Sequence, residues 1–439
     1  MANDFHPDIH KQIKLNRVEK RLTKRDLAGR IGISPSHMHR LEIGAVAPSS
    51  DEIRKLSERL EFEPWQSAGL THDITKTSER MVHANLYASY GEASEYAQDI
   101  VESYGKYENP RDHPAHAHCA LSLTFHALIE ASRRISGPSF KAWIERLYPD
   151  IVILKETYRG FEREIAYIVS ALYHFTTNTV EQGVHFLRRH RRFGKDANLL
   201  GFNHFLQGLT HYYDFRKQQV AMTAFERANE AFLKTNNFER VTHIKLYMQS
   251  IALNIGAETE FRKLNRDLDT YVRMRGNMTI YYRNKIHEVR YRLLRKEYDK
   301  AADVLRKLKN ETVFEYRLYD ILTRYRLGDV DGAKKALRAK KKTGMLPKSH
   351  RRFIEAMDAL LKDGPVEETL RHLKAFTDGV IAIGHVELIP FAVELYTETL
   401  EKHRQYKQAA RYSAIYLELL EEAVKEGGLP EDLSQGTVV

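Results

Sequence analysis

A short phrase recurs along the sequence from residue 180 onward, and it constrains the fold more than any other feature. Each copy follows a turn, opens with Val or Tyr, and continues as an amphipathic helix that contains small residues. Successive copies lie 40, 78, 32, 36 and 40 residues apart, and the gap of 78 holds a weaker copy near Thr259. Units of this length cannot bury an apolar face alone, so neighbouring units must stack. The phrase begins at Val180, Val220, Tyr298, Val330, Val366 and Tyr406.

Composition agrees with an almost wholly helical chain, because only 12 prolines and 23 glycines interrupt 439 residues. We therefore predict an all-α fold in which residues 78–428 form a right-handed, tetratricopeptide-like α-solenoid with a concave groove. Phe140 and Tyr96 extend the series towards the N-terminus, so that about nine helix pairs fit. Another kind of helical repeat remains an alternative, because the single copies are degenerate. Residues 429–439 are expected to form a tail.

The first seventy residues carry different signals, which are typical of four short helices. Thr23 stands three residues before Asp26, the spacing of a capping box at a helix start. Gly32 supplies a turn, and Ser34 followed by Pro35 marks the start of the next helix. Two short helices separated by a glycine turn are the arrangement of a helix-turn-helix.

These motifs resemble the XRE/Cro-type DNA-binding domain, and the likeness covers four helices in order over residues 10–70. We assign residues 1–70 to this N-terminal helix-turn-helix domain and residues 71–77 to a linker. The resemblance implies that the domain binds operator DNA as part of a dimer, because helix-turn-helix operators have two-fold symmetry. The stretches that carry the likeness are residues 22–28, 31–34 and 41–44.

The third helix of this domain is expected to enter the major groove of DNA. Met38 and Leu41 lie three residues apart and face the core, so the other side chains of this helix point outward. An outward Arg40 can pair with guanine, and the starts of the second and third helices suit phosphates. The alternative is that these side chains only solvate a surface helix. The predicted DNA-binding residues are Lys24, Arg25, Ser34, Ser36, His37, His39 and Arg40.

A small DNA-binding domain followed by such repeats resembles the RRNPP family of peptide-responsive transcription regulators from Gram-positive bacteria. The overall length, with about nine repeats, is most similar to the NprR-like branch of that family. The resemblance implies a cytoplasmic, homodimeric quorum-sensing regulator that binds a short signalling peptide in the concave groove of its repeats. Peptide binding would alter the oligomeric state or the affinity for operator DNA.

An extended peptide needs amide side chains in the groove, because Asn and Gln can bond a backbone N–H and C=O together. Polar residues spaced three or four apart form stripes on three otherwise apolar helices. Ordinary exposed faces and hydrogen bonds between repeats are the alternative explanation of these stripes. The predicted peptide-binding residues are Asn203, Gln207 and His211 on one helix, Tyr247, Ser250 and Asn254 on another, and Tyr282 and Arg283 on a third.

The net charge of +10 is unevenly distributed, since residues 262–352 carry 27 Lys and Arg against 11 Asp and Glu. This block, which includes Lys340, Lys341, Lys342, Arg351 and Arg352, is either a solvated face or a site that attracts an anion. In the second case a groove arginine such as Arg283 would hold a carboxylate of the ligand.

Several classes of function are not expected from this sequence. The single cysteine, Cys119, excludes an intramolecular disulfide, and no stretch approaches the 18 apolar residues that span a membrane. His113, His116, His118 and Cys119 resemble a metal cluster, but helical spacing turns His118 away, so no metal is expected. The sequence contains no glycine-rich phosphate loop, nucleophile elbow or His-Glu-X-X-His motif. We expect no cofactor and no enzymatic activity.

Two competing hypotheses remain from the sequence. The repeats could form a scaffold for a folded protein, such as a response regulator, with DNA binding secondary. They could also bind no ligand and serve only to oligomerise. The apolar helix around residues 412–420 is a candidate surface for packing on a second subunit.

Overall fold

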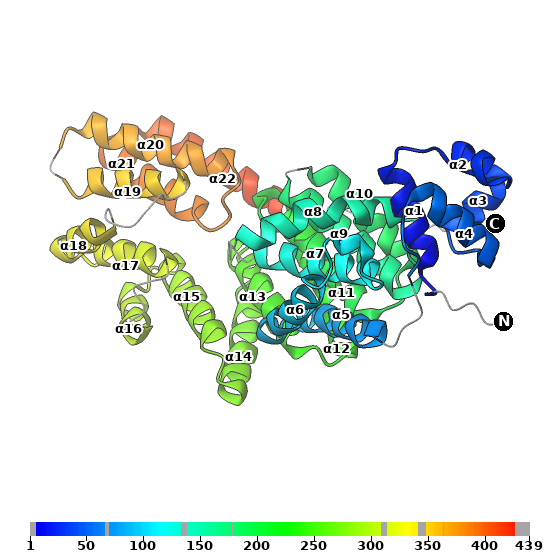
Figure 1. The fold of residues 1–439 in the computed structure, drawn as a ribbon. Coiled ribbons are helices and arrows are strands. Elements are labelled where there is room, and N and C mark those ends of the chain that lie inside the picture. Colours follow the sequence, from blue (N-terminus) through cyan, green and yellow to red (C-terminus); the bar gives the residue numbers. More distant parts are fainter. Residues whose placement is uncertain are drawn as a thin grey trace. The chain divides into compact units, whose positions relative to one another are not determined.

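The computed structural model describes residues 6–65, 70–132, 138–177, 179–308, 314–340, 348–362 and 364–425. These residues contain 22 α-helices and two short 3-10 helices and no strand, so the predicted all-α fold is confirmed (Figure 1). The chain divides into two compact units, Met1–Asn203 and His204–Val439. Within the described part of the chain, no helix is both long and apolar enough to cross a bilayer.

The first unit begins with four short helices: α1 (Ile9–Glu19), α2 (Lys24–Ile31), α3 (Pro35–Glu42) and α4 (Ser50–Leu60). The capping signals lie where the sequence predicts them. The Thr23 hydroxyl accepts a hydrogen bond from the Asp26 N–H in a complete capping box, and the Ser34 side chain caps α3 ahead of Pro35. Gly32 adopts the left-handed conformation (φ 79°) that ends α2.

Apolar side chains from all four helices form the core of this domain. Inside it, the buried carboxylate of Glu42 accepts hydrogen bonds from the Arg17 guanidinium and so ties α3 to α1. This pairing compensates the cost of burying both charges. The core consists of Ile9, Ile13, Leu27, Ala28, Ile31, Met38, Ile53, Leu56 and Leu60.

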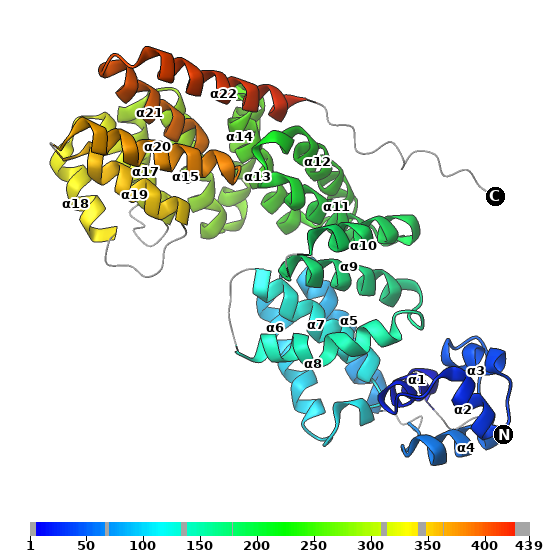
Figure 2. The same ribbon diagram turned by 90° about the horizontal axis from the view of Figure 1, so that it is seen from above.

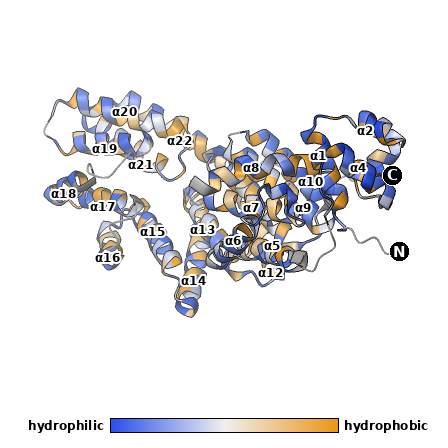
Figure 3. Ribbon diagram, viewed as in Figure 1, coloured by the Kyte–Doolittle hydropathy of each residue, from blue (hydrophilic) through white to orange (hydrophobic). Residues whose placement is uncertain are grey.

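The rest of the first unit is built from paired helices. Its helices are α5 (Leu70–Leu86), α6 (Tyr90–Tyr104), α7 (His116–Ser132), α8 (Pro138–Leu154), α9 (Gly160–Thr176) and α10 (Val180–Phe193), with a 3-10 helix at Pro110–Asp112. α5 packs on α6 and α7, and α7 packs on α8 and α9. Because α7 is enclosed on several sides, it is apolar and buried along most of its length (Figure 3).

The predicted linker at residues 71–77 is helical, because these residues lie inside α5. Neither proline nor glycine occurs between Leu70 and Leu86, and Ser78 and Met81 of this helix are buried. The repeat region therefore starts at Leu70, eight residues earlier than expected.

The second unit starts within α11 (Ala197–Tyr212) and continues the pairing to α22. The remaining helices are α12 (Gln218–Lys234), α13 (Phe238–Asn254), α14 (Glu258–Arg275), α15 (Met278–Leu294), α16 (Tyr298–Leu308), α17 (Phe314–Arg326), α18 (Val330–Lys340), α19 (Lys348–Leu360), α20 (Val366–Ala382), α21 (Ile389–Lys402) and α22 (Tyr406–Val424). A 3-10 helix at Phe215–Lys217 precedes α12. Among the described residues, α5 to α22 therefore form nine successive helix pairs.

The recurring phrase marks the second helix of a pair, where it begins α10, α16, α18, α20 and α22. The small residue within the phrase lies where the two helices cross. At Gly183, a Cβ atom would come within 2.4 Å of the Phe175 ring on the preceding helix. Ala301, Ala333 and Ala409 occupy the same position of later copies and are at most 2% exposed. The small side chain is therefore a condition for close packing of the pair.

The second unit closes on itself through its last helix. α22 packs against α12 and the Phe215–Lys217 turn (Figure 2). The rings of Phe215 and Tyr416 lie 6.4 Å apart, and Arg216 forms an ion pair of 2.8 Å with Glu422. Part of the surface that residues 412–420 were expected to offer to a second subunit is thus used within this chain. Tyr412 and Leu419 are buried within this chain, whereas Leu417 is exposed.

Candidate DNA-binding and ligand-binding sites

The α3 helix presents an exposed polar face, as the sequence predicts. Met38 and Leu41 are fully buried, whereas Ser36, His39 and Arg40 are exposed. Arg25 is exposed at the start of α2, and in the described part of the chain its guanidinium and that of Arg40 form no ion pair. Both cations are therefore available to an external anion such as a DNA phosphate.

The other predicted DNA-contacting residues are held by neighbours within the domain. Lys24 Nζ lies 2.9 Å from His39 Nδ1, which links the start of α2 to α3. His37 Nε2 lies 2.7 Å from the Glu52 carboxylate on α4, and its side chain is half-buried. His37 therefore braces α3 against α4, a role that differs from the predicted contact with DNA.

An ion cluster fixes α1 to the first repeats. His118 of α7 lies between two carboxylates, with Nε2 2.9 Å from Asp8 and Nδ1 2.9 Å from Glu162 of α9. Lys11 of α1 completes the cluster at 3.1 Å from Asp8 and 3.2 Å from Glu162. These four side chains are between 3% and 23% exposed, so their charges interact through a largely desolvated environment.

The cluster is charged at neutral pH. Burial opposes the charge of His118, but the hydrogen bonds to Asp8 and Glu162 outweigh it and raise the pKa of His118 to about 9. Burial likewise disfavours the two carboxylates, yet the bonds from His118 and the charge of Lys11 hold the pKa of Asp8 and that of Glu162 below their usual values. The helix-turn-helix domain is thus joined to the repeats by two cations and two anions.

The histidines and cysteine near residue 116 have structural partners. His116 Nε2 lies 2.9 Å from Asp150, which also binds Arg111, and His113 Nε2 lies 2.9 Å from the Ser103 hydroxyl. Cys119 is fully buried, and burial raises the pKa of its thiol to about 12. Among the residues that the structure describes, no group of three or more His, Cys, Asp or Glu side chains could hold a metal ion.

The three predicted peptide-binding residues of α11 differ in burial and in their partners. Asn203, in the first unit, is fully buried, donates a hydrogen bond of 2.8 Å to the Leu187 carbonyl, and lies 2.9 Å from His190 Nδ1. Gln207 is 9% exposed, and the half-buried His211 has a pKa lowered by burial. Asn203 therefore joins α11 to α10 and does not present its amide to solvent.

The α13 stripe forms part of a polar network inside the second unit. Ser250 accepts a hydrogen bond of 2.9 Å from Tyr212, and Asn254 donates one of 2.6 Å to Gln218. Both contact Arg290 of α15, which is fully buried and is not among the predicted site residues. Arg290 also donates a hydrogen bond of 3.1 Å to the Val386 carbonyl in the turn between α20 and α21.

Arg290 lies among neutral partners. Within the described residues, no carboxylate reaches ion-pair distance of its guanidinium, and its Nε has no hydrogen-bond partner. A buried cation without a counter-charge is unfavourable, so this position suits an anion. The spacing of Arg283, His287 and Arg290 on one face of α15 is the sequence signal that could have revealed it.

The interior of the second unit around Arg290 is aromatic and amide-rich. Tyr247 packs against Phe205, Tyr212 and Phe225, with ring centroids 5.0 to 5.8 Å apart. His287 Nδ1 lies 2.7 Å from the Gln249 side-chain oxygen. Burial and the charges of Arg290 and Arg283 lower the pKa of His287 to about 3, so it is neutral at pH 7.

The two predicted residues at the start of α15 differ in burial. Tyr282 is half-buried, whereas Arg283 is exposed on the helix surface. Tyr282 and the neighbouring Tyr281 pack edge to face, with ring centroids 5.6 Å apart. Of the two predicted residues, Arg283 therefore presents a charged group to solvent, whereas Tyr282 presents none.

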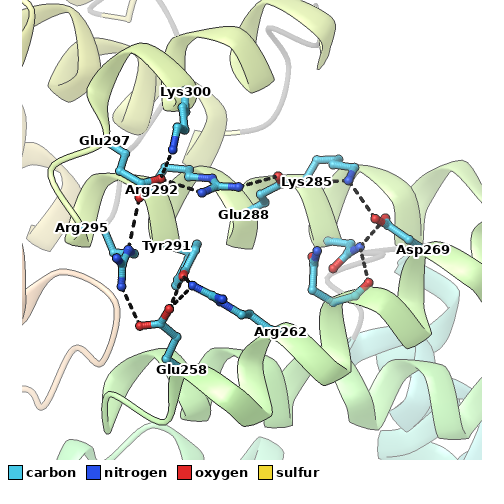
Figure 4. Close-up of polar contacts among 12 residues, drawn as sticks. Glu258, Arg262, Asp269, Lys285, Glu288, Tyr291, Arg292, Arg295, Glu297 and Lys300 are labelled. Carbon is cyan, nitrogen blue, oxygen red and sulfur yellow. Dashed lines mark hydrogen bonds and ion pairs between the residues drawn. The ribbon is translucent and has the colours of Figure 1, made fainter.

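Ion pairs account for much of the basic block. A cleft of about 570 Å³ is lined by residues of α14 and α15. Two of the arginines that line it, Arg262 and Arg292, form ion pairs with neighbouring carboxylates (Figure 4). Arg262 and Arg295 bind Glu258, and Arg292 binds Glu297 at 2.6 Å. The network braces α14, α15 and α16 against one another. Lys341 and Lys342 lie outside the described residues.

Comparison with known proteins agrees with this architecture. Residues 12–65 match a helix-turn-helix domain family. No curated protein sequence matches the chain. Among solved structures, a Rap protein complexed with competence and sporulation factor is similar with a TM-score of 0.58 and 11% identity, over 80% of this chain and 99% of that one. The apo form of the quorum sensor NprR from B. thuringiensis is similar with a TM-score of 0.54 and 10% identity, over the same shares.

At sequence identities of 10% and 11%, the comparisons show that the fold is shared. They confirm the predicted arrangement of an N-terminal helix-turn-helix domain followed by tetratricopeptide-like helical repeats. The chain therefore combines a helix-turn-helix domain with the repeat fold that the Rap and NprR structures share, which is the architecture that its sequence predicts.

Proposed function

We propose that the protein is a cytoplasmic transcription regulator that binds operator DNA through α3 and a short signalling peptide through its repeats. The observation that carries the proposal is the exposed polar face of α3 on a domain that is joined to helical repeats of the NprR and Rap fold.

For DNA binding, Arg40 is the proposed reader of a base edge, with Ser36 and His39 beside it. Arg40 is exposed and unpaired among the described residues, so a guanine can take both of its terminal N–H groups. Lys24, Arg25 and Ser34 lie at the starts of α2 and α3, where backbone N–H groups also favour phosphates.

For peptide binding, the inner surface of α13 and α15 is the proposed site. Tyr247, Ser250 and Asn254 supply an aromatic ring, a hydroxyl and an amide, and Arg290 supplies the buried charge. Tyr282 and Arg283 extend this surface along α15. A peptide carboxylate is a stronger acceptor for Arg290 than the Val386 carbonyl that it contacts in this structure.

A titration tests the two parts together. Operator fragments selected from random DNA are bound to the purified protein, and peptides from short reading frames near its gene are added. We expect one peptide to change DNA affinity or oligomeric state at least about tenfold, which corresponds to a modest coupling energy. The Arg40→Ala variant should weaken operator binding and leave peptide binding unchanged. The Asn254→Ala variant should weaken peptide binding and leave operator binding unchanged. If no peptide alters either property, the proposed control by peptide is wrong.

A further inference from the structure

One arginine of the repeats forms a hydrogen bond with the C-terminal end of α3. Arg159 lies at the start of α9, and its guanidinium donates a hydrogen bond of 3.0 Å to the carbonyl of Ile43. Ile43 is the C-terminal cap of α3. The other bonds of this guanidinium go to the carbonyls of Glu156 and Tyr158, and no carboxylate pairs with it in the described part of the chain.

A small cavity adjoins this arginine. It has a volume of about 170 Å³ and lies among α5, α7 and α9. Its lining combines four apolar side chains with Ser78, Ser122 and four charged groups. The apolar wall consists of Val82, Leu121, Phe161 and Ile165, and the charged groups are Glu79, His118, Arg159 and Glu162.

The four charged groups differ in how they are satisfied. His118 and Glu162 bind each other and the ions of α1, as described above. Arg159 makes hydrogen bonds only to backbone carbonyls, and the exposed Glu79 makes no ion pair among the described residues. The cavity therefore offers one cation and one anion without a counter-charge, next to an apolar wall.

This combination defines a ligand by its chemistry. The volume is below the usual range for drug-sized ligands, so the ligand has few heavy atoms. A carboxylate is the strongest partner for a guanidinium, an ammonium group suits Glu79, and an apolar side chain fits the wall. A free α-amino acid with an apolar side chain, such as leucine, carries all three groups.

We propose that this cavity binds a free apolar α-amino acid, and that the bound carboxylate draws Arg159 away from Ile43. The end of α3 then loses its tie to the repeats, while the ion cluster keeps α1 in place. The ligand thereby changes the freedom of the DNA-reading helix without detaching the domain. This site is separate from the surface of α13 and α15 proposed for a peptide.

Calorimetric titration of the full chain with L-leucine tests the binding. The wild-type protein should bind L-leucine and should bind leucinamide and N-acetyl-leucine at least about tenfold more weakly, because each analogue removes one charged partner. Arg159→Gln should weaken L-leucine binding by about tenfold to a hundredfold. Arg146→Gln is the matched control, since Arg146 is exposed on α8 and does not line the cavity.

Hydrogen exchange tests the coupling. L-leucine should speed the exchange of backbone N–H groups at the end of α3, including Gly44 and Ala45, and leave those of α1 unchanged. Equal binding of leucine and leucinamide, or no binding of either, overturns the assignment of the cavity. Binding without a change at Gly44 and Ala45 overturns the link to α3. Because the analogues are compared on the wild-type chain, neither result depends on how a variant folds.

Discussion

Two polar clusters, one in each unit, differ in how they satisfy their cations. In the first unit, Arg111 binds Asp150 at 2.6 Å, and His118 and Lys11 share Asp8 and Glu162. In the second unit, Arg290 is fully buried and contacts a hydroxyl, an amide and a carbonyl. Paired charges fix a structure, whereas an unmatched charge leaves capacity for a ligand. The difference separates a region that holds the DNA-binding domain from a region suited to an anion.

The largest effect is expected from breaking the paired charges. Glu162→Gln leaves His118 and Lys11 with Asp8 alone, and the attachment of α1 should lose about 3 kcal/mol. Hydrogen exchange of α1 in the full chain measures this loss. The control is Glu156→Gln, whose partner Lys14 is 3.6 Å away and whose side chain is 68% exposed, and it should cost less than about 1 kcal/mol. Equal effects of the two variants would show that the ion cluster does not attach α1 to the first repeats.

A pH series tests the attachment of α1 by the ion cluster without a mutation. The pKa of His118 is raised from 6.5 to about 9, so its contribution is fully present below about pH 6.5 and lost as the pH rises through 9. The loss is at most about 3 kcal/mol. The lowered pKa values of Asp8 and Glu162 give the opposite limit, with stability lost at acidic pH. Exchange of α1 between pH 6 and 10, with rates corrected for the intrinsic pH effect, should accelerate at the alkaline end. His118→Gln should remove that acceleration.

Substitutions on the DNA-binding face should change DNA affinity without affecting the ion cluster. Arg40→Ala is expected to cost about 1–3 kcal/mol in binding to the preferred operator and to relax the preference at one base pair. Lys24→Ala should weaken binding to all sequences and reduce the salt slope by about 1. Fluorescence anisotropy over a range of salt concentrations distinguishes the two, and Arg80→Ala on the exposed side of α5 serves as the control. A uniform loss with Arg40→Ala would remove its role as a base reader.

The smallest change in stability is expected where the charge is unmatched. Arg290→Met should leave the free energy of unfolding within about 1 kcal/mol, because the methionine removes a desolvated charge and fills similar space. Arg111→Met is the matched variant in the first unit and should cost more, since it removes both guanidinium hydrogen bonds to the buried Asp150. Denaturation of both variants by urea gives the comparison directly. If Arg290→Met is the more destabilising of the two, the interior of the second unit is a structural network.

The sequence predicted what depends on local or periodic signals. Thr23 and Ser34 cap the expected helices, and the recurring phrase marks the start of five later helices, α10, α16, α18, α20 and α22. The ion cluster was missed because His118 lies 110 residues from Asp8, and no local pattern connects them. The stripe through Asn203 was visible, but a stripe does not reveal which neighbouring helix faces it. The side-chain amide of Asn203 donates a hydrogen bond to a carbonyl of α10, so the position of α10 decides the role of Asn203.

The sealed position of Cys119 has a practical consequence. Its side chain is fully buried and its thiol is protonated at neutral pH, so maleimide dyes and spin labels that react with thiolates will not modify it. Since this is the single cysteine in the chain, the native sequence already serves as an unreactive background. Reporter thiols introduced on α3 and α1 can then follow the movement of either helix without removing a natural residue.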